Sequence, residues 1–402
     1  MLTPPTGARR VELIVLLGVL IACAPFSIDM YLPSLPTLAQ VFSASAAATE
    51  RTLTLFFLGF ATGQAIFGPL ADRFGRKPPL YAGLALFTIA SLGCAFAPSI
   101  EVLAGLRLFQ ALGACAGGVT ARAVVRDLFE PRDAVQVLAR MILVMGVAPL
   151  LAPLLGGYVL VTLGWKAIFL ILAAIGAVAL AAAWLQLPET HRAEHARASL
   201  HVVSILRDYF GILRDRSFLA YGLGAGIASG GVFGYVTGSP HVFIEIYHIP
   251  AQSFGLLFGL MALGMIIMSQ ASAYILKYHE PATVLRTAQT VQAVAGVVLL
   301  VAGATGFGGL YGLTPALFVY VAMNGAVGPS STALAMAPHA AQAGLASALL
   351  GTLGFGSGAL ASLAVGLLQG PSAFAMTLVV AVSGLAGLAL NLTLAPRRQS
   401  PI

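Results

Sequence analysis

The chain consists of long apolar runs that are separated by short polar stretches. Most runs are continuous and about twenty residues long, which is the length that an α-helix needs to cross the hydrocarbon core of a membrane. Charged residues, Pro or Gly end each run. The pattern predicts twelve membrane-spanning helices, at residues 12–37, 50–71, 79–97, 100–124, 135–162, 166–187, 217–243, 252–276, 282–304, 313–336, 343–369 and 372–395.

Composition supports helices that face lipid. Hydrophobic residues make up 59% of the 402 residues and charged residues only 9%, whereas soluble domains contain roughly 25% charged residues. The chain therefore lacks the charge that a water-facing surface needs. A closed β-barrel can also cross a membrane, but its strands alternate apolar and polar residues, and the runs here do not. We predict an all-α polytopic membrane protein.

The longest polar stretch divides the predicted spans into two sets of six. We therefore predict an N-terminal half at 1–187, a linker at 188–216 and a C-terminal half at 217–402. Two equal sets of spans are typical of transporters built from internal repeats. The repeat is weak in the sequence, because the polar motif at 68–78, after the second span, has no clear counterpart after the eighth.

The distribution of positive charge predicts the orientation. With the amino terminus in the cytoplasm, eighteen of the twenty-one Lys and Arg residues lie on the cytoplasmic side; Arg51 and Lys166 lie opposite, and Arg107 lies within a span. Such a bias sets the topology of membrane proteins. We expect a multi-pass protein of the bacterial inner membrane with both termini in the cytoplasm. The net charge of +7 then reflects basic loops beside the lipid bilayer, and we expect no nucleic-acid partner.

Several other classes of protein find no support in the sequence. Cys23, Cys94 and Cys115 all lie in apolar runs, and their odd number and lack of a CxxC pair favour neither disulfides nor a metal site. An intramembrane enzyme would need a nucleophile with a base, an HExxH motif or paired aspartates, and a receptor would need a sizeable soluble domain. We expect a monomer that is not an enzyme and that holds no cofactor or metal.

Asp29 is the first of two charged residues that are candidates for transport chemistry. An ionisable group within a membrane is costly unless it has a partner or a function. Asp29 is the only acidic residue that the predicted boundaries place well inside a span. Burial favours the neutral form of a carboxylate, so Asp29 could bind and release a proton near neutral pH. The alternative is a structural carboxylate near the outer membrane face.

Arg107 is the second candidate. It lies about seven residues, hence about 10 Å, inside the fourth span. Its guanidinium cannot lose its proton and must meet a carboxylate, carbonyl groups or water. Gln110, one turn further, can share its helix face. We expect a fixed positive charge that tunes the proton site or holds a substrate; the alternative is an Arg side chain that extends outward to the membrane surface.

The polar motif at 68–78 reads GPLADRFGRKP. Its glycines, Gly68 and Gly75, permit a tight turn. Asp72 can pair with Arg126 at the inner end of the fourth span, or it can lie at a neighbouring helix terminus. We expect such a cluster to hold an inner gate closed. Anchoring by positive charge alone would explain the basic residues but not Asp72 or the glycines. The predicted gate residues are Gly68, Asp72, Arg73, Gly75, Arg76 and Arg126.

The fifth span is rich in Pro and Gly. Prolines four residues apart bend a helix, and glycines let a neighbouring helix approach closely. A bent helix between two halves is a candidate for movement. The residues concerned are Gly146, Pro149, Pro153, Gly156 and Gly157.

Polar and aromatic side chains within apolar runs are candidates for substrate binding. Such side chains can instead bond one helix to another, where each contributes under about 2 kcal/mol. The candidates are Tyr31, Gln110, Tyr235 and Asn324.

Taken together, these motifs resemble the major facilitator superfamily and, within it, the twelve-span drug:proton antiporters of the Bcr/CflA type. Residues 28–36 (IDMYLPSLP) look like the first-span signature of that family, and 68–78 is similar to the superfamily loop motif. Residues 107–113 resemble the fourth-span motif, with Ala111 where Gly is usual, and 148–157 resemble the antiporter motif. In the second half, residues 328–333 and 343–351 also look like the family.

The resemblance implies the major facilitator fold and proton-driven export of drug-like small molecules by alternating access, with the proton gradient as the energy source. It implies that Asp29 is the proton carrier, Arg107 its partner and Asp72 part of the gate. Some relatives place a second acidic residue earlier in the first span, and residues 13–26 here contain none. The alternative is export of a metabolite, such as a sugar, amino acid or peptide, by the same mechanism.

Overall fold

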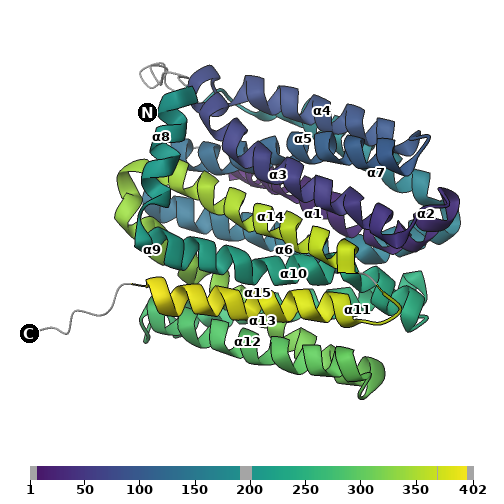
Figure 1. Cartoon of the computed structure of the whole chain (residues 1–402). Coiled ribbons are helices and arrows are strands. Elements are labelled where there is room, and N and C mark those ends of the chain that lie inside the picture. Colours follow the sequence, from purple (N-terminus) through teal and green to yellow (C-terminus); the bar gives the residue numbers. More distant parts are fainter. Residues whose placement is uncertain (1–6, 191–201, 369, 396–402) are drawn as a thin grey trace, which may run out of the picture. The chain divides into compact units, whose positions relative to one another are not determined.

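The computed structural model describes residues 7–190, 202–368 and 370–395. Within them the chain is almost entirely helical (Figure 1). Twelve helical segments there are long and apolar enough to cross a membrane. The predicted fold class is therefore confirmed. The segments are Arg9–Val41, Ala46–Phe74, Lys77–Ala95, Ile100–Leu128, Gly146–Leu163, Trp165–Gln186, Arg216–Ile246, Ala251–Ile275, Pro281–Thr305, Gly309–His339, Ala343–Leu368 and Phe374–Leu394.

The chain forms two compact units. The first comprises Met1–Leu200 together with Phe243–Gly259. Its elements are α1 (Gly7–Asp29), a 3-10 helix (Leu32–Ser34), α2 (Leu35–Val41), α3 (Ala46–Phe74), α4 (Lys77–Ala95), α5 (Ile100–Leu128), α6 (Pro131–Leu163), α7 (Trp165–Gln186) and the first part of α11 (Ala251–Ile275).

The second unit comprises His201–Val242 and Leu260–Ile402. Of the predicted linker 188–216, residues 191–201 lie outside the described residues, and α8 occupies much of the remainder. The predicted limits of the two halves stay a prediction. The elements are α8 (Val202–Leu213), α9 (Arg216–Phe218), a π-helix (Leu219–Leu223), α10 (Gly224–Pro240), most of α11, α12 (Pro281–Thr305), α13 (Gly309–Met336), a 3-10 helix (Ala337–Gln342), α14 (Ala343–Leu368) and α15 (Phe374–Leu394); a further π-helix, His241–Ile246, spans the boundary between the units.

Helix α5 is the centre of the first unit because its glycines admit the backbones of two neighbours. A Cβ added to Gly113 would lie 2.5 Å from both the carbonyl oxygen of Gly83 and the amide nitrogen of Phe87, on α4. A Cβ added to Gly117 would lie 2.5 Å from the carbonyl oxygen of Leu20, on α1. In lipid the hydrophobic effect does not drive helices to associate. Close van der Waals packing of this kind therefore stabilises the bundle.

The first span, predicted at 12–37, is not one continuous helix. Helix α1 ends at Asp29, and two turn residues lead into the 3-10 helix and α2. The amide of Tyr31 bonds to the carbonyl of Ile28 at 3.2 Å, three residues back, instead of four. Pro33 follows within the first turn of the 3-10 helix, and because it restricts the residue before it and has no amide, a regular α-helix does not continue there.

Buried polar side chains join the helices of the second unit. The Asn391 side chain on α15 donates to Gln289 Oε1 on α12 at 2.6 Å. The Tyr320 hydroxyl on α13 donates to the carbonyl of Ala228 on α10 at 2.9 Å. Hydrogen bonds of this kind, from one helix to another, are the alternative to substrate binding for polar side chains within apolar runs.

Replacement of Gly113 by Ala tests the packing at α5. The new methyl group would meet backbone atoms of α4, which cannot move aside as a side chain can. We expect Gly113→Ala to destabilise the protein by about 1–3 kcal/mol, seen as a lower midpoint of thermal unfolding in detergent. Gly105→Ala is the matched control on the same helix, since nothing lies within 4 Å of its added Cβ. Equal midpoints for the two variants would contradict the close approach.

Candidate functional site

Arg107, on α5, is completely buried, with an exposed fraction of 0%. The alternative of a side chain that extends outward to the membrane surface is therefore wrong. Its Nη1 donates to the carbonyl oxygen of Ser27 at 2.9 Å and to Gln110 Oε1 at 2.6 Å. The Ser27 carbonyl can accept this bond because the amide of Tyr31, four residues on, bonds to Ile28 instead. The end of α1 thus supplies a main-chain partner for the buried charge.

Two aromatic rings also face the guanidinium. The Arg107 guanidinium carbon lies 4.5 Å from the ring centroid of Tyr31 and 4.2 Å from that of Phe56. A desolvated cation over an aromatic face gains about 2 kcal/mol from each such contact. The Nε and Nη2 atoms are buried and have no hydrogen-bond partner in the part of the chain that the structure describes. The N–H groups on this edge of the guanidinium can therefore donate to a further acceptor.

Tyr31 and Gln110, both predicted to contact substrate, hold Arg107 in this structure. Gln110 Nε2 donates to Ser91 Oγ at 2.8 Å, which orients the amide oxygen toward Arg107. The Tyr31 hydroxyl and Thr52 Oγ1 are hydrogen-bonded at 2.8 Å. A role of either side chain in substrate contact stays a prediction.

Asp29 lies at the last position of α1 and is 6% exposed. It stands between Ser27, whose carbonyl binds Arg107, and Tyr31, whose ring faces Arg107. Among the described residues no ion pair joins Asp29 to Arg107. Asp29 and Arg107, predicted as partners, are thus connected through Ser27 and Tyr31 on the broken end of α1, and not by direct contact.

Glu50 is a second buried acidic residue, which the predicted limits of the spans did not indicate. Glu50 is only 3% exposed and lies inside α3, which begins at Ala46 rather than at 50. The Ser45 hydroxyl accepts the amide of Ala48 at 3.2 Å and so caps the helix. Ser is a preferred residue at this position, and this signal would have moved the predicted start. Glu50 lies four residues from the start of α3, so it is buried near the end of that span.

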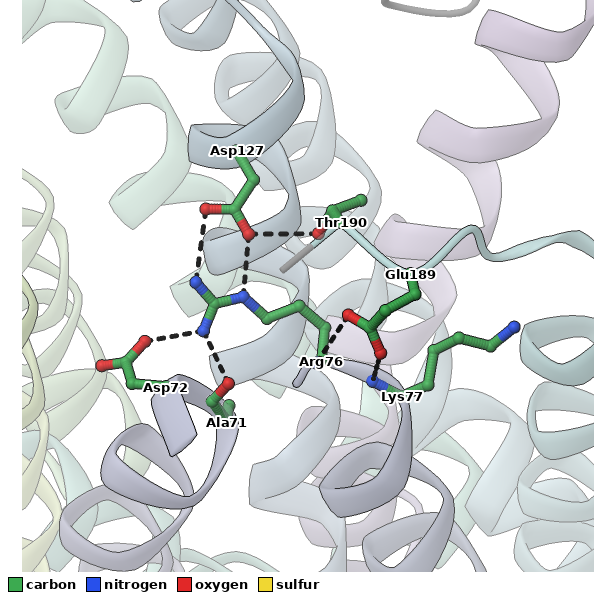
Figure 2. Close-up of polar contacts among 7 residues, drawn as sticks. All are labelled: Ala71, Asp72, Arg76, Lys77, Asp127, Glu189 and Thr190. Carbon is green, nitrogen blue, oxygen red and sulfur yellow. Dashed lines mark hydrogen bonds and ion pairs between the residues drawn. The ribbon is translucent and has the colours of Figure 1, made fainter. Parts of the chain in front are cut away.

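A second charged cluster surrounds Arg76, between α3 and α4 (Figure 2). We call it the Arg76 network; its members are Asp72, Arg76, Asp127, Glu189 and Thr190. Arg76 is 5% exposed. It donates from Nε to Asp127 Oδ2 at 2.8 Å, from Nη2 to Asp127 Oδ1 at 3.3 Å and from Nη1 to Asp72 Oδ1 at 2.6 Å.

The Arg76 guanidinium stays charged in this network. Burial by itself lowers the pKa of Arg76, but the hydrogen bonds to Asp127 and Asp72 outweigh it and raise the pKa above its ordinary value. The two-point contact with Asp127 is the geometry in which Arg and a carboxylate bind most strongly.

The predicted pair between Asp72 and Arg126 is wrong. Asp72 pairs with Arg76, four residues on, and Asp127 is the partner from α5. Arg126 is exposed, because adjacent residues of a helix point about 100° apart, so that only one of them faces the network. Arg73 is exposed as well.

Of the two motif glycines, only Gly75 forms a turn. It has a φ of 91°, in the region that favours glycine, and directly follows the last residue of α3. Gly68 lies inside α3, which continues through Pro69 to Phe74. The predicted turn at Gly68 is therefore wrong.

The glycines of the antiporter motif bring two other elements to α6. A Cβ on Gly156 would collide with the carbonyl of Met30, next to Asp29, and one on Gly157 would lie 2.5 Å from the carbonyl oxygen of Ala251 on α11. The helix continues without a break through Pro149 and Pro153. Gly146 is half-buried on the same helix. The motif thus supports the broken end of α1, and the proposed movement of α6 stays a prediction.

Tyr235 and Asn324 belong to the second unit. Tyr235, on α10, is 1% exposed. The oxygen of the Asn324 side chain, on α13, accepts a hydrogen bond from Ser229 Oγ at 2.9 Å. Both lie within apolar helices, as expected, and their contact with substrate stays a prediction.

Residues 17–362 match the profile of the Major Facilitator Superfamily. The chain is 38% identical to an uncharacterised MFS-type transporter, YdgK, of Bacillus subtilis, with 91% of each chain covered. It is 31% identical to a bicyclomycin resistance protein homolog of Haemophilus influenzae, over 93% of this chain and 94% of that one. It is also 31% identical to the multidrug transporter MdfA of Yersinia pestis, over 61% of this chain and 60% of that one.

Among solved structures, the D-xylose-proton symporter has a TM-score of 0.74 to this chain, with 96% of this chain and 97% of that one covered. The two sequences are 15% identical, so the likeness shows the fold alone. These comparisons describe a transporter and not an enzyme. The chain therefore belongs to the Major Facilitator Superfamily, and its relatives confirm the resemblance to the Bcr/CflA-type drug transporters within it.

Proposed function

We propose that the protein is a proton-coupled exporter of small drug-like molecules. It works as a monomer in the bacterial inner membrane, with both termini in the cytoplasm. The observation that carries this proposal is Asp29, a buried carboxylate at a break in α1, two residues from Ser27 and two from Tyr31, which both contact the buried charge of Arg107. A carboxylate in such surroundings can exist in either protonation state, whereas the Arg107 charge is fixed.

The cycle follows from the position of Asp29. A proton from outside and a substrate from inside compete for the site, and each favours a different conformation of the transporter by its differential affinity. Ser27 and Tyr31, two of the residues that contact Arg107, lie on the same broken helix end as Asp29. Protonation of Asp29 can therefore change the conformation of that end and, with it, the contacts of Arg107.

The relatives support drugs as the cargo. Their names include bicyclomycin resistance, chloramphenicol resistance and multidrug transport. Export of a metabolite is the alternative that a panel of drugs and metabolites would separate, with efflux measured from cells that overproduce the protein.

The variant Asp29→Asn tests proton coupling. The amide is nearly the same shape as the carboxylate but cannot take up a proton at neutral pH. In proteoliposomes with an imposed pH gradient, we expect the initial rate of drug efflux to fall at least about tenfold, which corresponds to roughly 1.4 kcal/mol. Asp208→Asn is the control, since Asp208 is exposed on α8 and should transport normally. Unchanged gradient-driven efflux by Asp29→Asn would refute the assignment.

The variant Arg107→Lys tests the need for the planar guanidinium. Lysine keeps the charge but has no planar group to place against the rings of Tyr31 and Phe56, and it lacks the fork of donors. We expect the efflux rate to fall about tenfold, a loss of roughly 1–2 kcal/mol. Arg51→Lys is the matched control, since Arg51 is exposed on α3 and should transport normally. A fully active Arg107→Lys variant would show that a positive charge alone suffices.

A further inference from the structure

We infer that Glu189 and Thr190 are positioning residues of the Arg76 network. Through them, the segment directly after α7 holds Arg76 and Asp127 in the positions that their ion pair requires. Nothing in the sequence motifs points to these two residues. The functional part of the inference rests on the proposed transport function.

Glu189 binds the start of α4. Its Oε1 accepts the amide of Arg76 at 2.9 Å, and its Oε2 accepts the amide of Lys77 at 3.1 Å. The first amides of a helix have no partner within the helix, and a negative charge there is stabilising. Pro78 and Pro79 have no amide, so Glu189 satisfies both N–H groups that residues 76–79 possess. One carboxylate therefore fixes the backbone from which the Arg76 side chain extends.

Gly75 shows that Glu189 fits closely against this turn. A Cβ at Gly75 would lie 2.9 Å from Glu189 Oε2 and 3.1 Å from its carboxyl carbon. Gly75 also has a φ of 91°. The motif glycine is thus required twice, once for its backbone conformation and once to leave room for the Glu189 carboxylate.

Thr190 holds the other partner of the ion pair. Its hydroxyl donates to Asp127 Oδ2 at 3.1 Å, and the same oxygen accepts Arg76 Nε at 2.8 Å (Figure 2). Thr190 is only 3% exposed, so little water competes for this bond. Glu189 therefore positions Arg76 by binding the main chain of Arg76. Thr190 positions Asp127 by binding the carboxylate of Asp127.

The consequence is a defined role for the start of the predicted linker. Glu189 contacts the start of α4, over a sequence separation of 113 residues to Arg76, and Thr190 contacts Asp127 near the end of α5. If the Arg76 network acts as the proposed gate, loss of these contacts changes the rate of the conformational step. It leaves substrate affinity unchanged, because no predicted substrate residue belongs to the network.

Hydrogen–deuterium exchange of the full-length protein in nanodiscs gives a test that needs no substrate. In Glu189→Gln, one accepting oxygen becomes an amide group that donates. We expect the amides of Arg76 and Lys77 to exchange about tenfold faster than in the wild type, since bonds to a charged acceptor are among the stronger ones. Unchanged exchange at these two amides would overturn the inference for Glu189.

Transport kinetics test the functional part. For drug efflux from proteoliposomes, Glu189→Gln and Thr190→Val should lower Vmax about three- to tenfold with KM unchanged, at equal amounts of folded protein. The matched variant Thr190→Ser keeps the hydroxyl and should restore the wild-type Vmax, and Glu189→Asp should recover part of it. Wild-type kinetics in both Glu189→Gln and Thr190→Val would overturn the positioning role. A rise in KM with unchanged Vmax would do so too.

A failure of the proposed function would look different. The wild-type protein would then show no gradient-driven efflux, or Asp29→Asn would keep it. The exchange of the Arg76 and Lys77 amides would still decide whether Glu189 holds the network, because that measurement requires neither a proton gradient nor a drug.

Discussion

A positive charge that cannot be neutralised, placed where no water reaches it, is the constraint on which the first unit depends. Arg107 has an exposed fraction of 0%, and a lone charge in such surroundings would cost several kcal/mol. Three elements meet this cost together: the carbonyl at the end of α1, the amide of Gln110 on α5 itself, and the rings of Tyr31 and Phe56. The break in α1 frees that carbonyl, and the glycine contacts of α5 bring the two helices close enough to use it.

The two charged clusters differ in the groups that bind the buried arginine. Around Arg107 a cation is held by neutral groups, and two of them, Ser27 and Tyr31, lie two residues from Asp29 along the chain. Around Arg76 the cation meets two carboxylates directly, and the Asp72 side chain, which is 50% exposed, keeps part of the cluster in contact with solvent. The Arg107 site thus connects a fixed charge to the helix end that contains Asp29. The Arg76 network keeps the ends of α3, α4 and α5 in a fixed relation.

The sequence predicted what depends on local pattern. Spans follow from runs of apolar residues that end at charge or proline, so their number and approximate limits were correct. Errors arose where the outcome depends on helix phase or on a helix end. Arg126 and Asp127 are neighbours, yet only Asp127 faces Arg76. Ser45 moves the start of α3 and brings Glu50 inside it. Glu189 and Thr190 carry no motif, because their role exists only once residues far apart in the sequence are brought together.

The bond from Arg107 to the Ser27 carbonyl has a consequence for genetics. The acceptor is a main-chain atom, so every amino acid at position 27 presents it, and substitution there does not delete the contact. Ser27 is itself 0% exposed, so a screen for loss of transport would recover Arg107 and Gln110, whereas at position 27 it would report only side chains too large for the site. Surveys that rank positions by mutational sensitivity would then assign the site to fewer residues than build it. Insertions, deletions or prolines that shift the backbone of the helix end would reveal the missing partner.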